Sequence, residues 1–358
     1  MRKSMFSFLK TNRPGGLSYI AATAAGTALL CGCGESNNRP GERDAPATFT
    51  LKYANFPPPS TFPCVQMEQF KEDLETRTEG RVKITTYPGG MLLDARAIYD
   101  GVINGTADIG NFAMSYQPGR FPVAEALDLP HFFPDSKTAT RALEAVMDAF
   151  KPAEFKDVVV LSVFTCPPAV LMTSRPVESV ADIKGLSIRS SGTGAEIMKR
   201  LDAIPTSMPQ SEVPDALQKN RVAGNLSSAE VLKDMNYAVP CPNVYAADLG
   251  VVSFAVVMNK RKFDRLPEDL QKILLELGRE QSHWTAQYVD QHAADAIAWG
   301  EKEHNVKVTV PSDADRATLR AAAAPLMEEY VERVKAKGVD GAKVLDVIQS
   351  VVGSRKSE

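Results

Sequence analysis

The chain has 358 residues, of which 44% are hydrophobic and 24% charged, and its formal net charge is −3. This composition is typical of a globular protein, and the length is enough for two ordinary domains. Neutralising nucleic-acid phosphates needs clustered Lys and Arg, and we find no such cluster in the body of the chain, so we predict no nucleic-acid partner.

The first 32 residues differ from the rest, because they contain four basic side chains and no acidic one. An apolar run at 17–30 follows the basic start, is too short to span a bilayer, and has the size of a signal-peptide core. Residues 30–33, Leu-Cys-Gly-Cys, resemble a bacterial lipobox, which predicts a lipoprotein signal peptide over 1–32 and lipidation of Cys33. The alternative is cleavage by a general signal peptidase without a lipid.

Residues 33–47 have little apolar content and are predicted to form a flexible tether. The expected location is therefore the periplasm, with the protein held at a bacterial membrane by a lipid on Cys33.

The following region alternates between strand and helix patterns. Strands are expected at 48–55, 81–87 and 107–112, with helices at 65–77 and 94–104 between them. Further buried strands are expected at 158–164, 186–189 and 251–259. This order predicts an α/β protein with mostly parallel sheets.

After residue 259 the pattern becomes helical. Pro267 opens a helix that is expected to reach about Glu303, which makes it about 55 Å long at 1.5 Å per residue. Such a helix is longer than a small domain is wide, so we interpret it as a brace across two lobes. A last strand at 305–310 and helices at 312–336 and 341–352 complete the chain.

Three cysteines follow the leader: Cys64, Cys166 and Cys241. Their number is odd, none has CxxC spacing, and no recognisable nucleophile motif joins any of them to one of the four histidines. We expect buried, unreactive thiols, no metal site and no cofactor.

Several segments carry a family resemblance. The segments 70–84 (FKEDLETRTEGRVKI), 87–92 (YPGGML) and 101–109 (GVINGTADI) resemble the N-terminal signature of solute-binding proteins of tripartite ATP-independent periplasmic (TRAP) transporters, the DctP family. The segment 175–189 (RPVESVADIKGLSIR) resembles the central motif of that family. Two later blocks follow in the family's order, at 208–218 and 257–267, so the resemblance covers most of residues 48–335.

The resemblance implies a two-lobed periplasmic binding protein that closes on its ligand like a flytrap, with hinge strands and a long bracing helix. Lobe I is expected at 48–166 plus 254–295, lobe II at 167–253 plus 296–340, and a C-terminal helix and tail at 341–358. The family passes a small organic acid to a permease with a small and a large membrane subunit. Uptake uses an ion gradient, and the binding protein itself does no chemistry.

Arg189 is the strongest candidate for ligand binding. It ends a short strand and precedes Ser190, Ser191 and a glycine-containing turn, after which a helix is expected from 195. A guanidinium clamps a carboxylate through two parallel hydrogen bonds, and a helix start adds backbone N–H donors. The resemblance assigns the same role to this position. The alternative is an ion pair between the lobes.

Two departures from the family pattern bear on the ligand. The stretch 166–173 lacks the second basic residue that several sugar-acid and sialic-acid binders of the family carry. In the segment 222–228, Ala223 and Leu226 replace acidic residues, and Ser227 takes the place of the family's polar ligand contact. One strong cation in an apolar wall predicts a monocarboxylate with a compact apolar or aromatic body.

Three further wall candidates, Phe56, Asn111 and Tyr116, are chosen because they follow strands whose carboxyl ends would face the crevice. A fourth, Tyr245, lies before the expected hinge strand. For each of them, ordinary packing is an equally good interpretation.

Two other classes of function compete with this one. A binding protein for an ATP-driven importer or a sensor kinase would share the fold and the lipid anchor. An enzyme acting in the cleft is disfavoured, because the sequence has no paired nucleophile and base motif and no GxSxG elbow.

Overall fold

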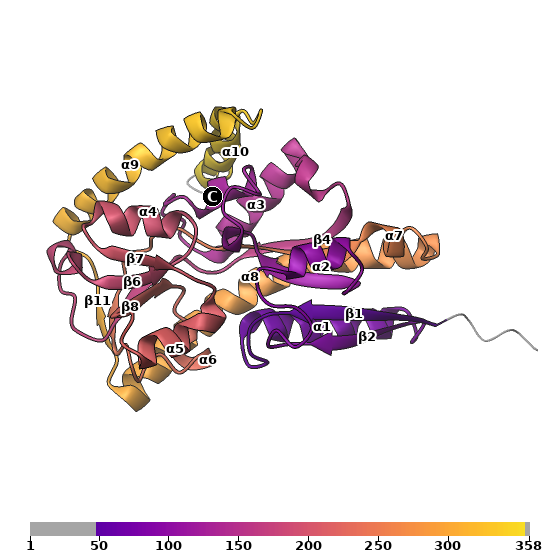
Figure 1. The fold of residues 1–358 in the computed structure, drawn as a ribbon, viewed down its shortest axis with the longest axis horizontal. Coiled ribbons are helices and arrows are strands. Elements are labelled where there is room, and N and C mark those ends of the chain that lie inside the picture. The colour runs from indigo at the N-terminus through magenta and orange to yellow at the C-terminus, as the bar shows by residue number, and fades with distance from the viewer. Residues whose placement is uncertain (1–47, 355–358) are drawn as a thin grey trace, which may run out of the picture. The chain divides into compact units, whose positions relative to one another are not determined.

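The computed structural model describes residues 48–354, so the predicted signal peptide, the lipidation site Cys33 and the tether lie outside the described residues. Two β-sheets form the framework of the described part (Figure 1). The first sheet has five strands in the order β2 (Val82–Tyr87), β1 (Phe49–Asn55), β3 (Ile109–Ala113), β10 (Ser253–Asn259) and β4 (Val158–Thr165).

The second sheet has six shorter strands. Their order is β11 (Lys307–Thr309), β9 (Asn243–Tyr245), β5 (Val170–Thr173), β8 (Gly224–Ser227), β6 (Ser187–Ser190) and β7 (Ile204–Ser207). Strands β5, β7, β8 and β9 had no counterpart among the sequence predictions, because runs of three or four residues are too short to show a clear alternation.

Both sheets are mixed, whereas the sequence order predicted mostly parallel ones. The chain leaves the first sheet at the end of β4 and returns to it at the start of β10, where Ser253 pairs with Thr165. A strand that leaves a sheet and a strand that returns at the same end must run in opposite directions. For that reason β10 is antiparallel to both of its neighbours, β3 and β4.

Ten helices surround these sheets in the described part of the chain. They are α1 (Phe62–Arg77), α2 (Ile98–Ile103), α3 (Ser136–Phe150), α4 (Thr193–Arg200), α5 (Val213–Gln218), α6 (Val231–Asp234), α7 (Lys260–Phe263), α8 (Glu268–His304), α9 (Asp313–Lys335) and α10 (Gly341–Ser354). Helices α1, α2 and α3 pack on the first sheet, and α4 packs on the second.

The long helix α8 has 37 residues. It contacts β4, α1 and α3 around the first sheet, and α6, which follows β8 of the second sheet. Its length agrees with the predicted brace. Helix α9 then runs beside α4, and α10 folds back against α3 (Figure 1).

Helix α2 is shorter than the predicted 94–104 helix. The carboxylate of Asp94 accepts hydrogen bonds from the backbone N–H groups of Arg96 and Ala97, at 2.9 and 3.1 Å. This local bonding holds residues 94–97 in a turn instead of a first helical turn, as Asp side chains commonly do. The turn places Arg96 at the edge of the cleft described below.

Candidate functional site

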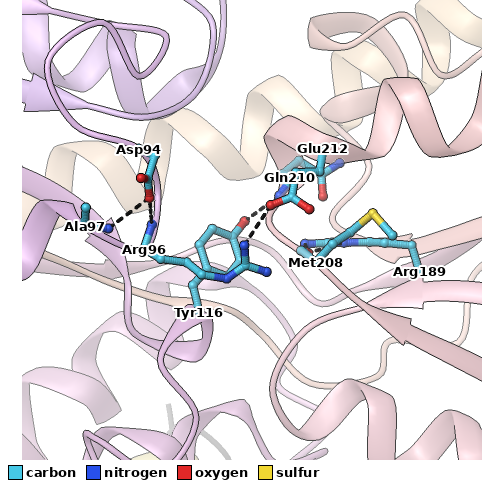
Figure 2. Close-up of polar contacts among 8 residues, drawn as sticks. All are labelled: Asp94, Arg96, Ala97, Tyr116, Arg189, Met208, Gln210 and Glu212. Atoms are coloured by element: carbon cyan, nitrogen blue, oxygen red, sulfur yellow. Dashed lines mark hydrogen bonds and ion pairs between the residues drawn. The ribbon is translucent and has the colours of Figure 1, made fainter.

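Arg189 is the centre of the site. It lies in β6, next to Thr206 of β7 and Asn225 of β8, and is 2% exposed. Its Nε and one terminal nitrogen donate to the main-chain oxygen of Met208, at 2.9 and 2.7 Å, and the other terminal nitrogen donates to Asn225 Oδ1 at 3.2 Å. Figure 2 shows the contact with Met208.

These bonds fix the guanidinium but do not neutralise it. A guanidinium carries five N–H donors, so two remain without a partner among the described residues. The acceptors are a main-chain carbonyl and a side-chain amide oxygen, and no described carboxylate pairs with Arg189. The described residues therefore show no ion pair between the lobes at Arg189, which was the alternative to a role in ligand binding. A buried cation without a counter-ion is costly, and an anionic ligand would offset that cost.

A cavity of about 50 Å³ adjoins Arg189, and residues of both sheets and their connections line it. Since one water needs about 10–15 Å³ on this measure, the cavity is small and has room for only a few waters. Of the predicted site residues, Phe56, Tyr116, Arg189 and Ser227 line it. The other lining residues are Pro57, Thr61, Phe62, Pro63, Cys166, Ser191, Gln210, Ser228, Glu230, Val231, Asp234, Met235, Val252 and Phe254.

One wall of the cavity is aromatic. Phe56 and Tyr116 meet edge to face with their ring centroids 5.4 Å apart, and Phe62 meets Phe254 in the same way at 5.7 Å. Phe254 also stacks on Phe164 at 5.3 Å. Such rings supply a large, rigid apolar surface for a ligand body.

Two contacts join the halves of the site beside the cavity. The backbone N–H of Gln210 donates to the hydroxyl oxygen of Tyr116 at 3.1 Å, and Arg96 forms an ion pair with Glu212 at 2.8 Å (Figure 2). Arg96 and Tyr116 belong to the part built on the first sheet, whereas Gln210 and Glu212 lie in the short helical turn that precedes α5. The structure therefore shows the cleft closed over the cavity.

The opposite wall carries acidic groups. Glu230 is 3% exposed, and its Oε1 accepts a hydrogen bond from the Ser228 hydroxyl at 2.7 Å. Asp234 pairs with His292 of α8 at 2.7 Å, and this hydrogen bond raises the pKa of the imidazole. Burial raises the pKa of the Glu230 carboxyl to about 7.

The sequence-predicted residues do not all meet here. Asn111 is fully buried within β3 and does not line the cavity, and its amide atoms have no hydrogen-bond partner among the described residues. Tyr245 lies in β9 and is also outside the cavity. Burial, together with the nearby charge of Asp315, raises the pKa of its phenol to about 12.

Sequence reasoning missed Phe62, Phe254, Gln210 and Glu230. Phe254 belongs to a predicted strand, but its place beside the cavity depends on where β10 re-enters the first sheet. Glu230 lies three residues after Ser227, which was the available signal for it.

The cavity is lined by one cysteine. The cavity cysteine, Cys166, is a neutral thiol at ordinary pH, because burial raises its pKa to about 12. Cys64 and Cys241 are likewise free and buried, as predicted. Within residues 48–354, no three side chains of the metal-binding types come together, and no helix has the length and apolar character needed to cross a membrane.

Two sheets linked by hinge strands, with a buried cation in a cleft between them, define a two-lobed ligand-binding protein. Residues 53–333 match the sequence model of the family described as bacterial extracellular solute-binding protein, family 7 (DctP). The chain belongs to this family, whose members are the solute-binding proteins of TRAP transporters.

Known relatives agree with this assignment. The chain is 28% identical to the 2,3-diketo-L-gulonate-binding periplasmic protein YiaO of Escherichia coli over 290 residues, which cover 80% of this chain and 88% of that one. Among solved structures, a TRAP periplasmic solute-binding protein from Desulfovibrio salexigens is 43% identical, with a TM-score of 0.78 over 86% of this chain and 96% of that one. That structure is an open complex with the C-terminus of a symmetry mate in its ligand-binding site.

A second solved structure is a TRAP solute-binding protein from Rhodoferax ferrireducens in complex with copurified benzoate. It is 26% identical, and its TM-score is 0.82 over 87% of this chain and 99% of that one. The family is therefore extracytoplasmic, and its members bind small organic ligands for a TRAP permease.

Proposed function

We propose that this protein captures a monocarboxylate with a compact apolar or aromatic body and delivers it to the small and large membrane subunits of a TRAP permease. The observation that carries the proposal is the buried guanidinium of Arg189, which keeps two N–H donors at a cavity walled by aromatic rings. The donors suit one carboxylate, and the rings suit the rest of the molecule.

The relatives support a carboxylate ligand. The C-terminus of a symmetry mate occupies the site of the 43% identical protein, and a polypeptide ends in a carboxylate. Benzoate, an aromatic monocarboxylate, copurified with the 26% identical protein. YiaO is named for a polyhydroxy acid, 2,3-diketo-L-gulonate, and that class of ligand is the principal competitor to be tested.

The test is a thermal-shift screen of the purified protein, which is first unfolded and refolded to remove any copurified ligand. A ligand at a hundredfold excess over its Kd stabilises the folded protein by about 2.7 kcal/mol, which is easily measured. We expect shifts with benzoate and branched monocarboxylates, and weaker ones with succinate, a uronate or 2,3-diketo-L-gulonate. Micromolar affinity for those competitors with millimolar affinity for benzoate would contradict the proposed ligand class.

Arg189→Ala should weaken binding of the acid that gives the largest shift in this screen, here called the active acid, at least a hundredfold. The reason is that it removes a charged, bidentate partner from a buried site. Arg189→Lys keeps the charge but loses the planar fork, so it should bind with intermediate affinity. Circular dichroism of both ligand-free variants checks their folding. A full thermal shift in well-folded Arg189→Ala protein would remove Arg189 from the carboxylate role.

We further propose that the mature protein is anchored in the periplasm by a lipid on Cys33. Cys33→Ser should move the protein from the membrane fraction to the soluble fraction and abolish incorporation of labelled palmitate. Unchanged fractionation would favour cleavage without lipidation.

A further inference from the structure

Glu230 is a buried carboxyl group whose hydrogen bonding is incomplete. It precedes helix α6, and its Oε1 accepts from Ser228, which is itself buried. Its Oε2 has no hydrogen-bond partner within residues 48–354. Leaving a buried polar atom unsatisfied costs free energy, so such an atom in a binding cavity points to a missing partner.

The second cavity carboxylate, Asp234, is in a different situation. Its Oδ1 contacts His292 Nε2 at 2.7 Å, and the positive charge that the imidazole gains matches the negative charge of the carboxylate. Glu230 has a neutral hydroxyl as its side-chain partner instead. It is also not paired with Arg189, whose three hydrogen bonds go to Met208 and Asn225. Asp234 Oδ2 also has no hydrogen-bond partner among the described residues, but its carboxylate makes an ion pair with His292. Of these two cavity carboxyl groups, Glu230 is the one that makes no ion pair with a described residue.

The kind of partner follows from the surroundings. An ammonium group would bring a further charge into a small buried space that Arg189 and Asp234 already line, and its desolvation would be costly. A hydroxyl group carries no such penalty and donates one hydrogen bond. The burial that raises the pKa of Glu230 to about 7 is consistent with a site built for neutral partners.

Resting on the proposed function, we infer that Glu230 is a specificity-determining residue that selects monocarboxylates bearing a hydroxyl group. The ligand carboxylate binds the two unused N–H donors of Arg189, and its hydroxyl donates to Glu230. The aromatic wall formed by Phe56, Tyr116, Phe62 and Phe254 contacts the carbon skeleton between these two ends.

The test is isothermal titration calorimetry at pH 8 with matched acids that differ by one hydroxyl. The pairs are benzoate with 3- and 4-hydroxybenzoate, and propanoate with 2- and 3-hydroxypropanoate. Sites that bond a ligand hydroxyl discriminate strongly against the analogue without it. We expect at least one hydroxylated acid to bind the wild-type protein about 10- to 100-fold more tightly than its parent.

Glu230→Leu should bring the ratio of the two affinities within a pair close to one, whatever happens to the absolute affinities, because leucine cannot accept the hydrogen bond from the hydroxyl. Circular dichroism of the ligand-free variant checks its folding. Glu230→Gln, which keeps an acceptor oxygen, should retain part of the preference and provides a second variant if Glu230→Leu does not fold. A merely structural role of Glu230 would change both members of a pair equally and leave their ratio unchanged.

Two outcomes would overturn the inference. The first is a wild-type protein that binds acids through Arg189 but shows no preference for any hydroxylated acid, as expected if water satisfies Glu230. The second is a preference that survives in Glu230→Leu. If no acid binds, or if Arg189→Ala has no effect, then the proposed function fails and this inference fails with it.

Discussion

At the residue scale, Asp128 connects the parts that surround the cleft. Its Oδ1 accepts hydrogen bonds from the backbone N–H and the hydroxyl of Ser253, at 3.1 and 2.9 Å, where β10 begins. Its main-chain oxygen accepts from the Thr193 hydroxyl at the start of α4. Burial raises the pKa of its carboxyl to about 8, so the folded protein holds a proton that an exposed Asp would release near pH 4.

This difference gives the first prediction, for Asp128→Asn. Between about pH 4 and pH 8 the folded wild-type protein binds one more proton at this residue than the unfolded protein does, so the contribution of Asp128 to stability falls as pH rises. Asparagine mimics the protonated acid and does not titrate. As the pH rises across this window, the free energy of unfolding of the variant, minus that of wild type, should therefore increase by about 1 kcal/mol per pH unit.

Guanidinium unfolding of both proteins at several pH values from 5 to 8 checks this prediction. Other titrating groups are common to the two proteins and cancel in the difference. Parallel stability curves for wild type and Asp128→Asn would show that Asp128 does not titrate in this window.

At the element scale, helix α8 packs on the first sheet through a glycine. A Cβ atom placed on Gly278 would lie 2.0 Å from the main-chain oxygen of Leu161 in β4, a contact that needs the helix and strand to move apart. This close approach explains how the brace lies directly on the hinge strand β4. It also explains a glycine inside a helix, where it costs about 1 kcal/mol relative to alanine.

Gly278→Ala should therefore destabilise the protein by about 1–3 kcal/mol, although alanine is the better helix former. Gly353 in α10 offers a matched control, because a Cβ there would meet nothing within 4 Å. Gly353→Ala should be neutral or slightly stabilising. Thermal unfolding of the two variants measures the difference, and equal effects would argue against tight packing between α8 and β4.

At the scale of the whole molecule, the ion pair between Arg96 and Glu212 joins the part built on the first sheet to the turn at 210–212. The two side chains are 53% and 49% exposed, so the pair contributes about 1 kcal/mol or less and weakens with salt. Because the pair joins the part built on the first sheet to the turn at 210–212 (Figure 2), we expect that small free energy to favour the closed state and to slow release of the ligand.

We expect Arg96→Ala to increase the rate of ligand release about two- to fivefold at low salt, with a smaller effect at high salt. Exchanging the charges, in Arg96→Glu with Glu212→Arg, should restore slow release. Arg77→Ala is the matched control, because its ion pair with Glu280 joins α1 to α8 and does not involve the turn at 210–212. Stopped-flow measurements with the active acid test this, and equal rates in all four proteins would exclude a closing role.

Much of the architecture follows from local patterns. The 37-residue helix α8 was predicted almost to the residue, because a proline precedes it and a strand pattern follows it. Strand β6, which contains Arg189, was likewise predicted. The turn at Asp94 was not predicted, because it depends on one carboxylate that competes for backbone N–H groups. The antiparallel direction of β10 was not predicted either, because it depends on where the polypeptide returns to the first sheet.

The candidate site was predicted in part for a similar reason. Phe56, Tyr116, Arg189 and Ser227 line the cavity, and each lies near the end of a strand. Asn111 lies inside β3 and Tyr245 ends β9, and both are outside the cavity, because a sequence pattern says nothing about which neighbours cover a strand. Whether any of these residues contacts the ligand stays a prediction.

By itself, the sequence determined the family, the class of fold and the cation that would bind an acid, because these depend on motifs and periodicity within short segments. The tertiary structure decided which side chains face that cation. Glu230, Phe62 and Phe254 lie far from Arg189 in the sequence, and only the folding of two sheets around one cleft brings them to the same cavity. The donors of Arg189 and the acceptor of Glu230 are without partners among the described residues because of which side chains the fold packs around them, and the sequence alone does not specify those neighbours.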